Sequence, residues 1–120
     1  MVITHEKLNK KKCTPCEGKN QPFSKAQAQK YLKEVPGWNL ADDGKSISRP
    51  YVMKNFMAAI QLMGRIAELA EQEQHHPDLH LTDYRNFKID LSTHKIGGLS
   101  ENDFILAAKI NHLPAELKTK

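Results

Sequence analysis

The sequence predicts an α+β fold in which a four-stranded antiparallel sheet carries three helices on one face. The first observation behind this prediction is a long amphipathic helical pattern over residues 55–74. The second is a pair of short strand patterns on each side of that helix, each pair joined by turn residues. The third is a helix signal before the first pair and another after the second. The predicted element order is therefore α-β-β-α-β-β-α.

The first helix is predicted to begin at Ser24, because serine is a good N-cap residue. Pro36-Gly37 ends it, since proline lacks a backbone N–H and glycine favours a helix end. A short strand over residues 38–40 follows, and Asp42-Asp43-Gly44 is typical of a tight turn. These signals predict the first strand of a hairpin and its turn.

The second strand of this hairpin is predicted over residues 47–53. Its side chains alternate, so that one face carries Ile47, Arg49, Tyr51 and Met53. Pro50 lies inside this strand and has no N–H to donate to a sheet ladder. We therefore expect an edge position or a bulge at Pro50.

The helix over residues 55–74 has the clearest periodicity. Its apolar residues recur at helical spacing and are expected to face the core: Phe56, Ile60, Met63, Ala67 and Ala70. The opposite side carries Gln61, Arg65, Glu68 and Gln72. The helix is predicted to end near His75-His76, because Pro77 pushes the residue before it toward extended geometry.

The second hairpin and a last helix complete the predicted fold. A strand over residues 79–81 leads through a turn at Thr82-Asp83 into a strand with Phe87, Ile89 and Leu91 on its core face. Gly97-Gly98 breaks that strand. Ser100 is expected to start the last helix, which carries Phe104, Ala107, Ala108 and Asn111 on one stripe and stops near Pro114.

The domain boundaries follow from composition and charge. Residues 1–22 are expected to be a loosely ordered lysine-rich lead-in, residues 23–114 a single domain, and residues 115–120 a tail. The net charge is +4, but residues 21–115 carry 11 basic and 11 acidic groups, so the excess lies at the two ends. A nucleic-acid reader would concentrate its basic residues on the folded surface, and we expect no nucleic-acid partner.

The protein is expected to be cytoplasmic and not to bind membranes. The longest apolar run, Phe56 to Ile60, is too short to cross a bilayer. The lysine-rich start has no apolar central region of the kind that a secretory signal needs. Cys13 and Cys16, in Cys-Thr-Pro-Cys, have no second pair to complete a zinc site, so a free thiol pair is favoured over a metal or redox site.

Three histidines form a candidate acid–base site. His75 and His76 lie at a helix end, where the helix dipole favours the charged imidazole and mutual repulsion opposes it. The two effects could keep these groups near neutrality, where histidine both gives and takes protons. His94 shares the alternation of the non-core side of its strand, so it is expected to lie off the core. Taken singly, each is also explained as an ordinary surface or capping residue.

Two alternatives stay open at this site. In extended geometry His76, Asp78 and His80 point to one side and could bind zinc or iron, although they match no standard spacing. Asp103 lies three residues after Ser100, as in a capping box, and an acidic residue in a first helical turn is stabilising without any catalytic role.

The combined motifs resemble the pterin-4a-carbinolamine dehydratase family. The residues that carry the resemblance are His75-His76-Pro77-Asp78, Tyr84, Leu91-Ser92-Thr93-His94 and Gly98-Leu99-Ser100-Glu101-Asn102-Asp103. The likeness extends over roughly residues 22–113, and the Cys-x-x-Cys-Glu-Gly lead-in is similar to that of bacterial members.

The resemblance implies an activity, a site and partners. It implies dehydration of 4a-hydroxytetrahydropterin to quinonoid dihydropterin without a cofactor, which recycles tetrahydrobiopterin for aromatic amino-acid hydroxylases. The residues that it makes catalytic are His75, His76, His94 and Asp103. Those that it makes substrate-binding are Pro77, Thr93, Lys95 and Ile96. It also implies a homodimer or homotetramer and leaves open a hydroxylase as a protein partner.

Two other functions compete with the dehydratase. One is a binding module, because animal relatives also serve as a dimerisation cofactor for a transcription regulator. The other is a metalloenzyme with histidine ligands. Pull-down of a partner by a histidine-free variant would favour the first, and stoichiometric metal in the purified protein would favour the second.

Overall fold

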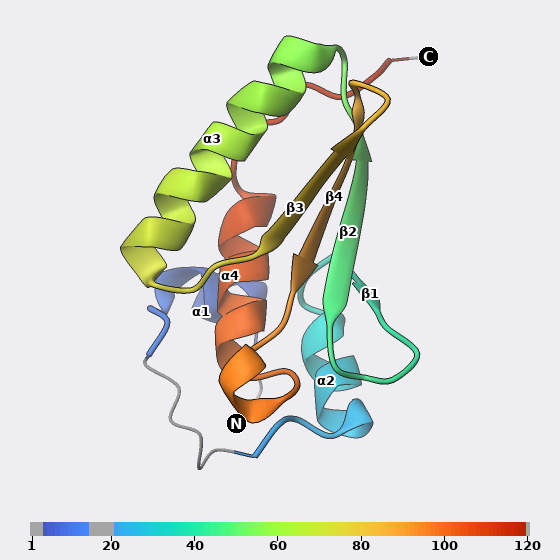
Figure 1. Cartoon of the computed structure of the whole chain (residues 1–120). Helices are drawn as coiled ribbons and strands as arrows, with labels where there is room; N and C mark the ends of the chain where they lie inside the picture. Colours follow the sequence, from blue (N-terminus) through green and yellow to red (C-terminus); the bar gives the residue numbers. More distant parts are fainter. Residues whose placement is uncertain (1–3, 15–20, 120) are drawn as a thin grey trace.

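The computed structural model describes residues 4–14 and 21–119, and in them a four-stranded antiparallel sheet carries helices on one face. The strands are β1 (Asn39–Leu40), β2 (Ile47–Val52), β3 (Asp78–Thr82) and β4 (Asn86–Leu91), in the spatial order β1-β2-β4-β3. The helices are α1 (His5–Lys10), α2 (Lys25–Leu32), α3 (Phe56–Glu73) and α4 (Glu101–Asn111), with a 3-10 turn η1 (His94–Ile96) between β4 and α4. The predicted fold class is confirmed (Figure 1).

The sheet brings the two hairpins together through β2 and β4. These strands pair along the full length of β2, from Ile47 opposite Leu91 to Val52 opposite Asn86. Strand β1 pairs only with the first two residues of β2. Pro50 therefore lies where one side of β2 has no neighbouring strand among the described residues, and this is the edge position that the sequence predicts.

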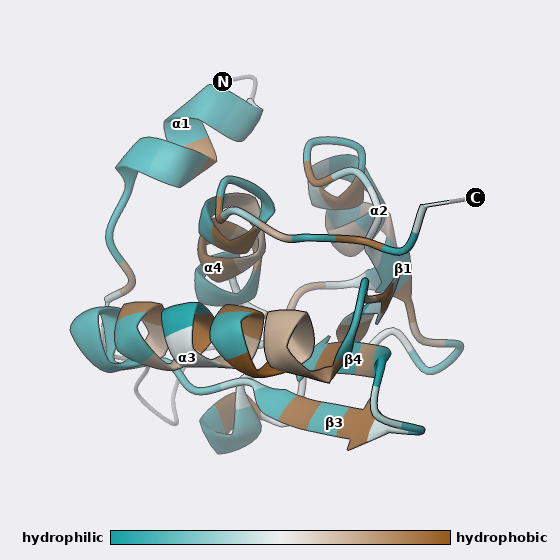
Figure 2. Ribbon diagram, turned by 90° about the horizontal axis from the view of Figure 1, so that it is seen from above, coloured by the Kyte–Doolittle hydropathy of each residue, from teal (hydrophilic) through white to brown (hydrophobic). Residues whose placement is uncertain are grey.

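Seen from above, the helices lie together on one side of the sheet, and β3 forms its outer edge (Figure 2). Strand β3 alternates polar exposed residues with the half-buried Leu79 and Leu81. None of the helices in the described residues is both long and apolar enough to cross a membrane.

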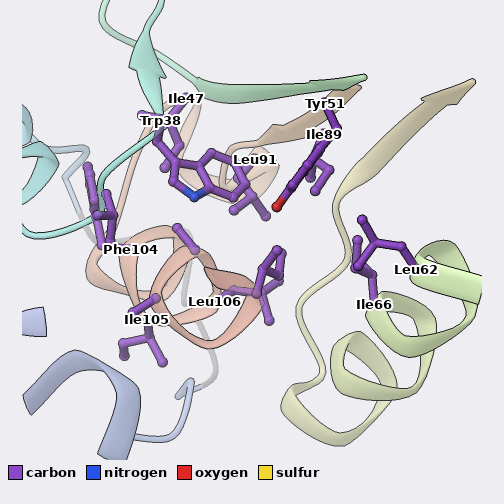
Figure 3. Close-up of a cluster of buried hydrophobic side chains, with 14 of the residues drawn as sticks. Trp38, Ile47, Tyr51, Leu62, Ile66, Ile89, Leu91, Phe104, Ile105 and Leu106 are labelled. Carbon is purple, nitrogen blue, oxygen red and sulfur yellow. The ribbon is translucent and has the colours of Figure 1, made fainter. Parts of the chain in front are cut away.

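Helix α4 forms the centre of the core. Phe104, Ile105 and Leu106 are all at most 2% exposed, so the helix is buried around its circumference and not only on the predicted stripe. In Figure 3, Phe104 and Ile105 lie on the side of α4 that is turned away from Leu62 and Ile66 of α3. A single apolar stripe was the wrong expectation, because α1 and α3 both pack on this helix and cover its other sides.

The described part of the lead-in before Cys13 departs from the prediction of a loosely ordered segment. Residues 5–10 form α1, which begins after the N-cap Thr4 and packs on α4. Leu8 is fully buried in the core. The four lysines before Cys13 hide this signal in the sequence, because one apolar residue in a short basic stretch gives no helical periodicity.

The buried face of α3 is also not the predicted one. Phe56 and Ile60 are 50% and 41% exposed, whereas Leu62 and Ile66 are fully buried. Ala70 alone belongs to both stripes. The helix carries two overlapping apolar series at helical spacing, and periodicity does not tell which of them meets the sheet.

This assignment of faces predicts that two isoleucine-to-alanine variants of α3 lose different amounts of unfolding free energy. Ile66→Ala should lower the free energy of unfolding by about 2–5 kcal/mol, because it leaves a cavity in the core. Ile60→Ala should cost less than about 1 kcal/mol in the monomer, because its side chain is already partly in water. Urea unfolding at several protein concentrations measures both values. Equal losses that do not depend on concentration would show that the faces are wrongly assigned.

Candidate active site

His75 and Asp103 are in direct contact at the candidate site. His75 follows Gln74, which ends α3 in the left-handed conformation (φ 54°) and so turns the chain away from the helix. The Nε2 atom of His75 lies 2.7 Å from Oδ1 of Asp103, in the first turn of α4. The His75 side chain is 11% exposed and the Asp103 side chain is fully buried. A carboxylate in this position fixes which ring nitrogen of His75 faces the interior.

The second oxygen of Asp103 caps its own helix. Oδ2 accepts hydrogen bonds from the backbone N–H of Ser100 at 3.0 Å and from the hydroxyl of Thr93 at 2.9 Å. The Thr93 and Ser100 hydroxyls are themselves 2.8 Å apart. The two explanations that the sequence leaves open for Asp103, a cap and a histidine partner, thus each have a contact in the structure.

His94 reaches the same region from the end of β4. The strand stops at Leu91, and η1 then turns the chain, with Gly97 at φ +70° closing it. The backbone N–H of Thr93 donates to the carbonyl of Gly98 at 2.7 Å. Thr93 consequently points inward and is buried, while His94 is exposed. The predicted position of His94 off the core is confirmed, although the turn and not the strand alternation places it.

One cavity of about 580 Å³ brings the three predicted histidines together. It is lined by His75, His76, His94, Thr93, Lys95, Ser92, Cys13, Thr14, Gln72, Glu73, Gln74 and Asn102. Two of the predicted substrate-binding residues lie elsewhere. Pro77 lines a neighbouring hollow with Leu79 and Ile66, because it leads the chain from α3 into β3. Ile96 lines a third hollow with Phe23.

His76 differs from His75 in its surroundings. Its side chain is 61% exposed, and its Nε2 lies 2.6 Å from a carboxylate oxygen of Glu71, which is also exposed. An ion pair in such a position contributes little to stability. The pair places the His76 ring beside Glu71 at the edge of the cavity, a partner that the spacing of the motifs did not indicate.

The residues expected for a metal site are not assembled. Among residues 4–14 and 21–119, no group of three or more His, Cys, Asp or Glu side chains is placed to hold a metal ion. His76 faces Glu71, and His80 instead lies 2.9 Å from Asp90 on the neighbouring strand. The set of His76, Asp78 and His80 therefore does not converge.

Sequence reasoning did not assign the seven other lining residues to the site, and Cys13, Glu73 and Asn102 are among them. Glu73 is a charged residue, of a kind that is usually solvated, yet it shares the buried face of Ile66 and Ala70 on α3 and its side chain is 7% exposed. Cys13 is a free thiol, as expected, and burial together with the nearby Glu73 carboxylate raises its pKa to about 12. Cys16 lies outside the described residues.

Known proteins match most of this chain. The sequence pattern of the family described as "Pterin 4 alpha carbinolamine dehydratase" matches residues 21–113. A mitochondrial pterin-4-alpha-carbinolamine dehydratase 2 of Arabidopsis thaliana is 47% identical over 112 residues, which are 91% of this chain and 60% of that protein. A provisionally named pterin-4-alpha-carbinolamine dehydratase of Halorhodospira halophila is 44% identical and is covered over 98% of its length.

A solved structure agrees with these sequence matches. The crystal structure of a transcriptional coactivator/pterin dehydratase from Brucella melitensis superposes with a TM-score of 0.71 and 28% sequence identity. The match covers 76% of this chain and 96% of that one. The chain therefore belongs to the pterin-4a-carbinolamine dehydratase family, as its motifs predict, and is a hydro-lyase.

Proposed function

We propose that the protein dehydrates 4a-hydroxytetrahydropterin to quinonoid dihydropterin through acid–base catalysis by its histidines. The observation that carries the proposal is the cavity between α3, the end of β4 and η1, which His75, His76 and His94 all line. Behind His75, the buried carboxylate of Asp103 holds the ring in place. The family supplies the identity of the substrate.

The reaction needs two proton transfers. The hydroxyl on carbon 4a leaves as water once it receives a proton, and the C–O bond breaks. The neighbouring ring nitrogen loses its proton, and its electron pair forms the carbon–nitrogen double bond. We assign these transfers to His75 and His94, since a well-placed general acid or base contributes about 100- to 10,000-fold to the rate.

The other cavity residues are assigned to binding. His76, held by Glu71, orients the pterin ring. Thr93 and Lys95 line the cavity beside His94 and would contact the substrate. Pro77 and Ile96 lie outside this cavity, so we assign them the positioning of the flanking chain and not a contact with the pterin.

The direct test is stopped-flow absorbance of carbinolamine generated by a pterin-dependent hydroxylase. Added protein should speed the loss of water in proportion to its concentration, and chelator treatment should leave this rate unchanged. Water loss at the uncatalysed rate would contradict the proposed function.

We also propose a homodimer or homotetramer. The exposed edge strand β3 offers unpaired backbone groups to a second copy. A second candidate surface is the apolar patch formed by Val52, Phe56, Met57 and Ile60, which are between 41% and 60% exposed. Sedimentation equilibrium measures the number of copies. A monomer at all concentrations would contradict the proposal.

The reaction is expected to operate beside an aromatic amino-acid hydroxylase in the cytoplasm. Its substrate is the product that such a hydroxylase leaves on its pterin. The free thiol of Cys13 is in keeping with a reducing compartment.

A further inference from the structure

The short segment that follows α1 lies against the ends of two other helices. We call residues 11–14 the arm. In Figure 1 it descends from α1 past the end of α3. The backbone N–H of Cys13 donates to Oε1 of Glu73 at 2.8 Å, at the end of α3. Thr14 and Asn102 bond reciprocally: the Thr14 N–H donates to Asn102 Oδ1 at 3.0 Å, and Asn102 Nδ2 donates to the Thr14 carbonyl at 2.6 Å.

The acceptor in the contact with the Cys13 N–H is the buried carboxylate of Glu73. Glu73 is 7% exposed, and its second carboxylate oxygen lies 3.6 Å from Nζ of Lys109 on α4. A buried carboxylate is costly unless its oxygens are satisfied, so the arm N–H and the lysine together make this position tolerable. The arm is thus bonded to groups that also connect α3 with α4.

The residues on both sides of the contacts between the arm and the two helices line the cavity of the three histidines. Cys13 and Thr14 line it from the arm, and Glu73 and Asn102 line it from the two helices. Lys11 forms an ion pair with Glu101 at 3.0 Å, outside this cavity. The arm therefore supplies a wall of the cavity from a part of the chain before the region that matches the family pattern, residues 21–113.

We propose that the arm is a fixed wall of the pterin pocket and that Glu73 and Asn102 are positioning residues that hold it there. This inference rests on the proposed function and adds a determinant of substrate affinity to it. The arm does not take part in the proton transfers, which the histidines carry out. It completes the pocket against which the pterin ring packs.

The chemistry of Cys13 agrees with a wall and not with a nucleophile. Burial and the Glu73 carboxylate raise the pKa of the thiol to about 12, so the thiol stays neutral near physiological pH. Its Sγ lies 3.6 Å from the carbonyl oxygen of Asn102, to which it can donate a weak hydrogen bond. A neutral thiol held in this way presents a small, slightly polar surface to the cavity.

The matched variants Glu73→Gln and Glu73→Met test the positioning role. Both remove the charge opposite Lys109, but only glutamine keeps an oxygen that can accept the Cys13 N–H. We expect Glu73→Met to raise KM by about tenfold with kcat changed by less than about threefold, and Glu73→Gln to keep KM within about threefold of the parent. Equal KM values in the two variants would overturn the role of Glu73. Lys54→Ala, which removes an exposed ion pair with Glu116 outside both the arm and the cavity, is the control and should change neither constant.

Labelling of Cys13 gives a readout that does not depend on turnover. In a Cys16→Ser chain, N-ethylmaleimide should label Cys13 slowly, and 7,8-dihydropterin should slow the reaction further because it fills the pocket beside the thiol. If 7,8-dihydropterin does not change the rate at which Cys13 is labelled, in a protein with normal turnover, the arm is not a wall of the pocket. Failure of the unmodified protein to dehydrate the carbinolamine would instead contradict the proposed function.

Discussion

Replacing His94 by alanine should lower kcat by about 100- to 10,000-fold while leaving the free energy of unfolding within about 0.5 kcal/mol of the parent. The rate should fall because the cavity loses one of the two groups assigned to proton transfer. Stability should hold because the ring is exposed and lies in a turn, outside the core. Stopped-flow dehydration and urea unfolding on the same preparation measure the two quantities.

His80→Ala is the matched control for this variant. Like His94, His80 is an exposed histidine, but it lies on β3 next to the carboxylate of Asp90 and does not line the cavity. Its loss should leave kcat unchanged within about twofold, since it has no assigned role in binding or proton transfer. A His94→Ala protein with the same turnover as His80→Ala would remove His94 from the mechanism.

His75→Ala should lose as much activity, but at a cost in stability. The sequence places both histidines off the core, and for His75 this is only partly true, since its side chain is 11% exposed. Its removal leaves Oδ1 of the buried Asp103 without this partner, which typically costs about 1–3 kcal/mol. We therefore expect nearly unchanged folding for His94→Ala and a measurable loss of stability for His75→Ala.

Local signals predicted most of the fold because they depend on few neighbours. Ser24 and Ser100 both cap helices, each in a capping box, because a serine oxygen satisfies free N–H groups wherever a helix begins. The alternation of Phe87, Ile89 and Leu91 predicted the buried face of β4, because a strand in a sheet with one covered face has two unequal sides.

The errors share a different cause, which is tertiary contact. Leu8 gives α1 its buried side only because α4 is there to receive it. Ile60 and Ile66 each belong to an apolar series at helical spacing, and only the position of the sheet separates the exposed one from the buried one. Glu73 looks like a solvated helix residue until the arm and Lys109 enclose it. No periodicity along one segment carries such information.

The candidate site could be predicted to a similar extent. The histidines were identified from their positions at a helix end and a strand end, and the structure brings all three to one cavity. The other residues that line the cavity were less predictable, because Pro77 and Ile96 are close in sequence to the three histidines but line other hollows. Sequence proximity determines which segment reaches the site, and the turn geometry determines which side chain enters it.

Asp103→Asn separates the two roles of this carboxylate. Asparagine can keep the cap, with its side-chain oxygen accepting from the Ser100 N–H and the Thr93 hydroxyl. Its NH₂ group then faces His75 Nε2 and must donate to it, so the ring is forced into the tautomer with its proton on Nδ1. A histidine held in the wrong tautomer cannot transfer its proton in the required direction, and comparable changes at other carboxylate–histidine pairs cost up to about 10,000-fold.

We therefore expect Asp103→Asn to lower kcat by about 100-fold or more, with a loss of unfolding free energy below about 1 kcal/mol. Asp103→Ala, the control, removes the cap and the histidine partner together. Its kcat should be similarly low, and its free energy of unfolding should fall by about 1 kcal/mol more, because the cap alone contributes about 0.5–2 kcal/mol. Stopped-flow rates and urea unfolding of both variants test the pair. A fast, stable Asp103→Asn protein beside a fast but unstable Asp103→Ala protein would mean that the carboxylate serves only as a cap, and that the contact with His75 does not hold a catalytic tautomer.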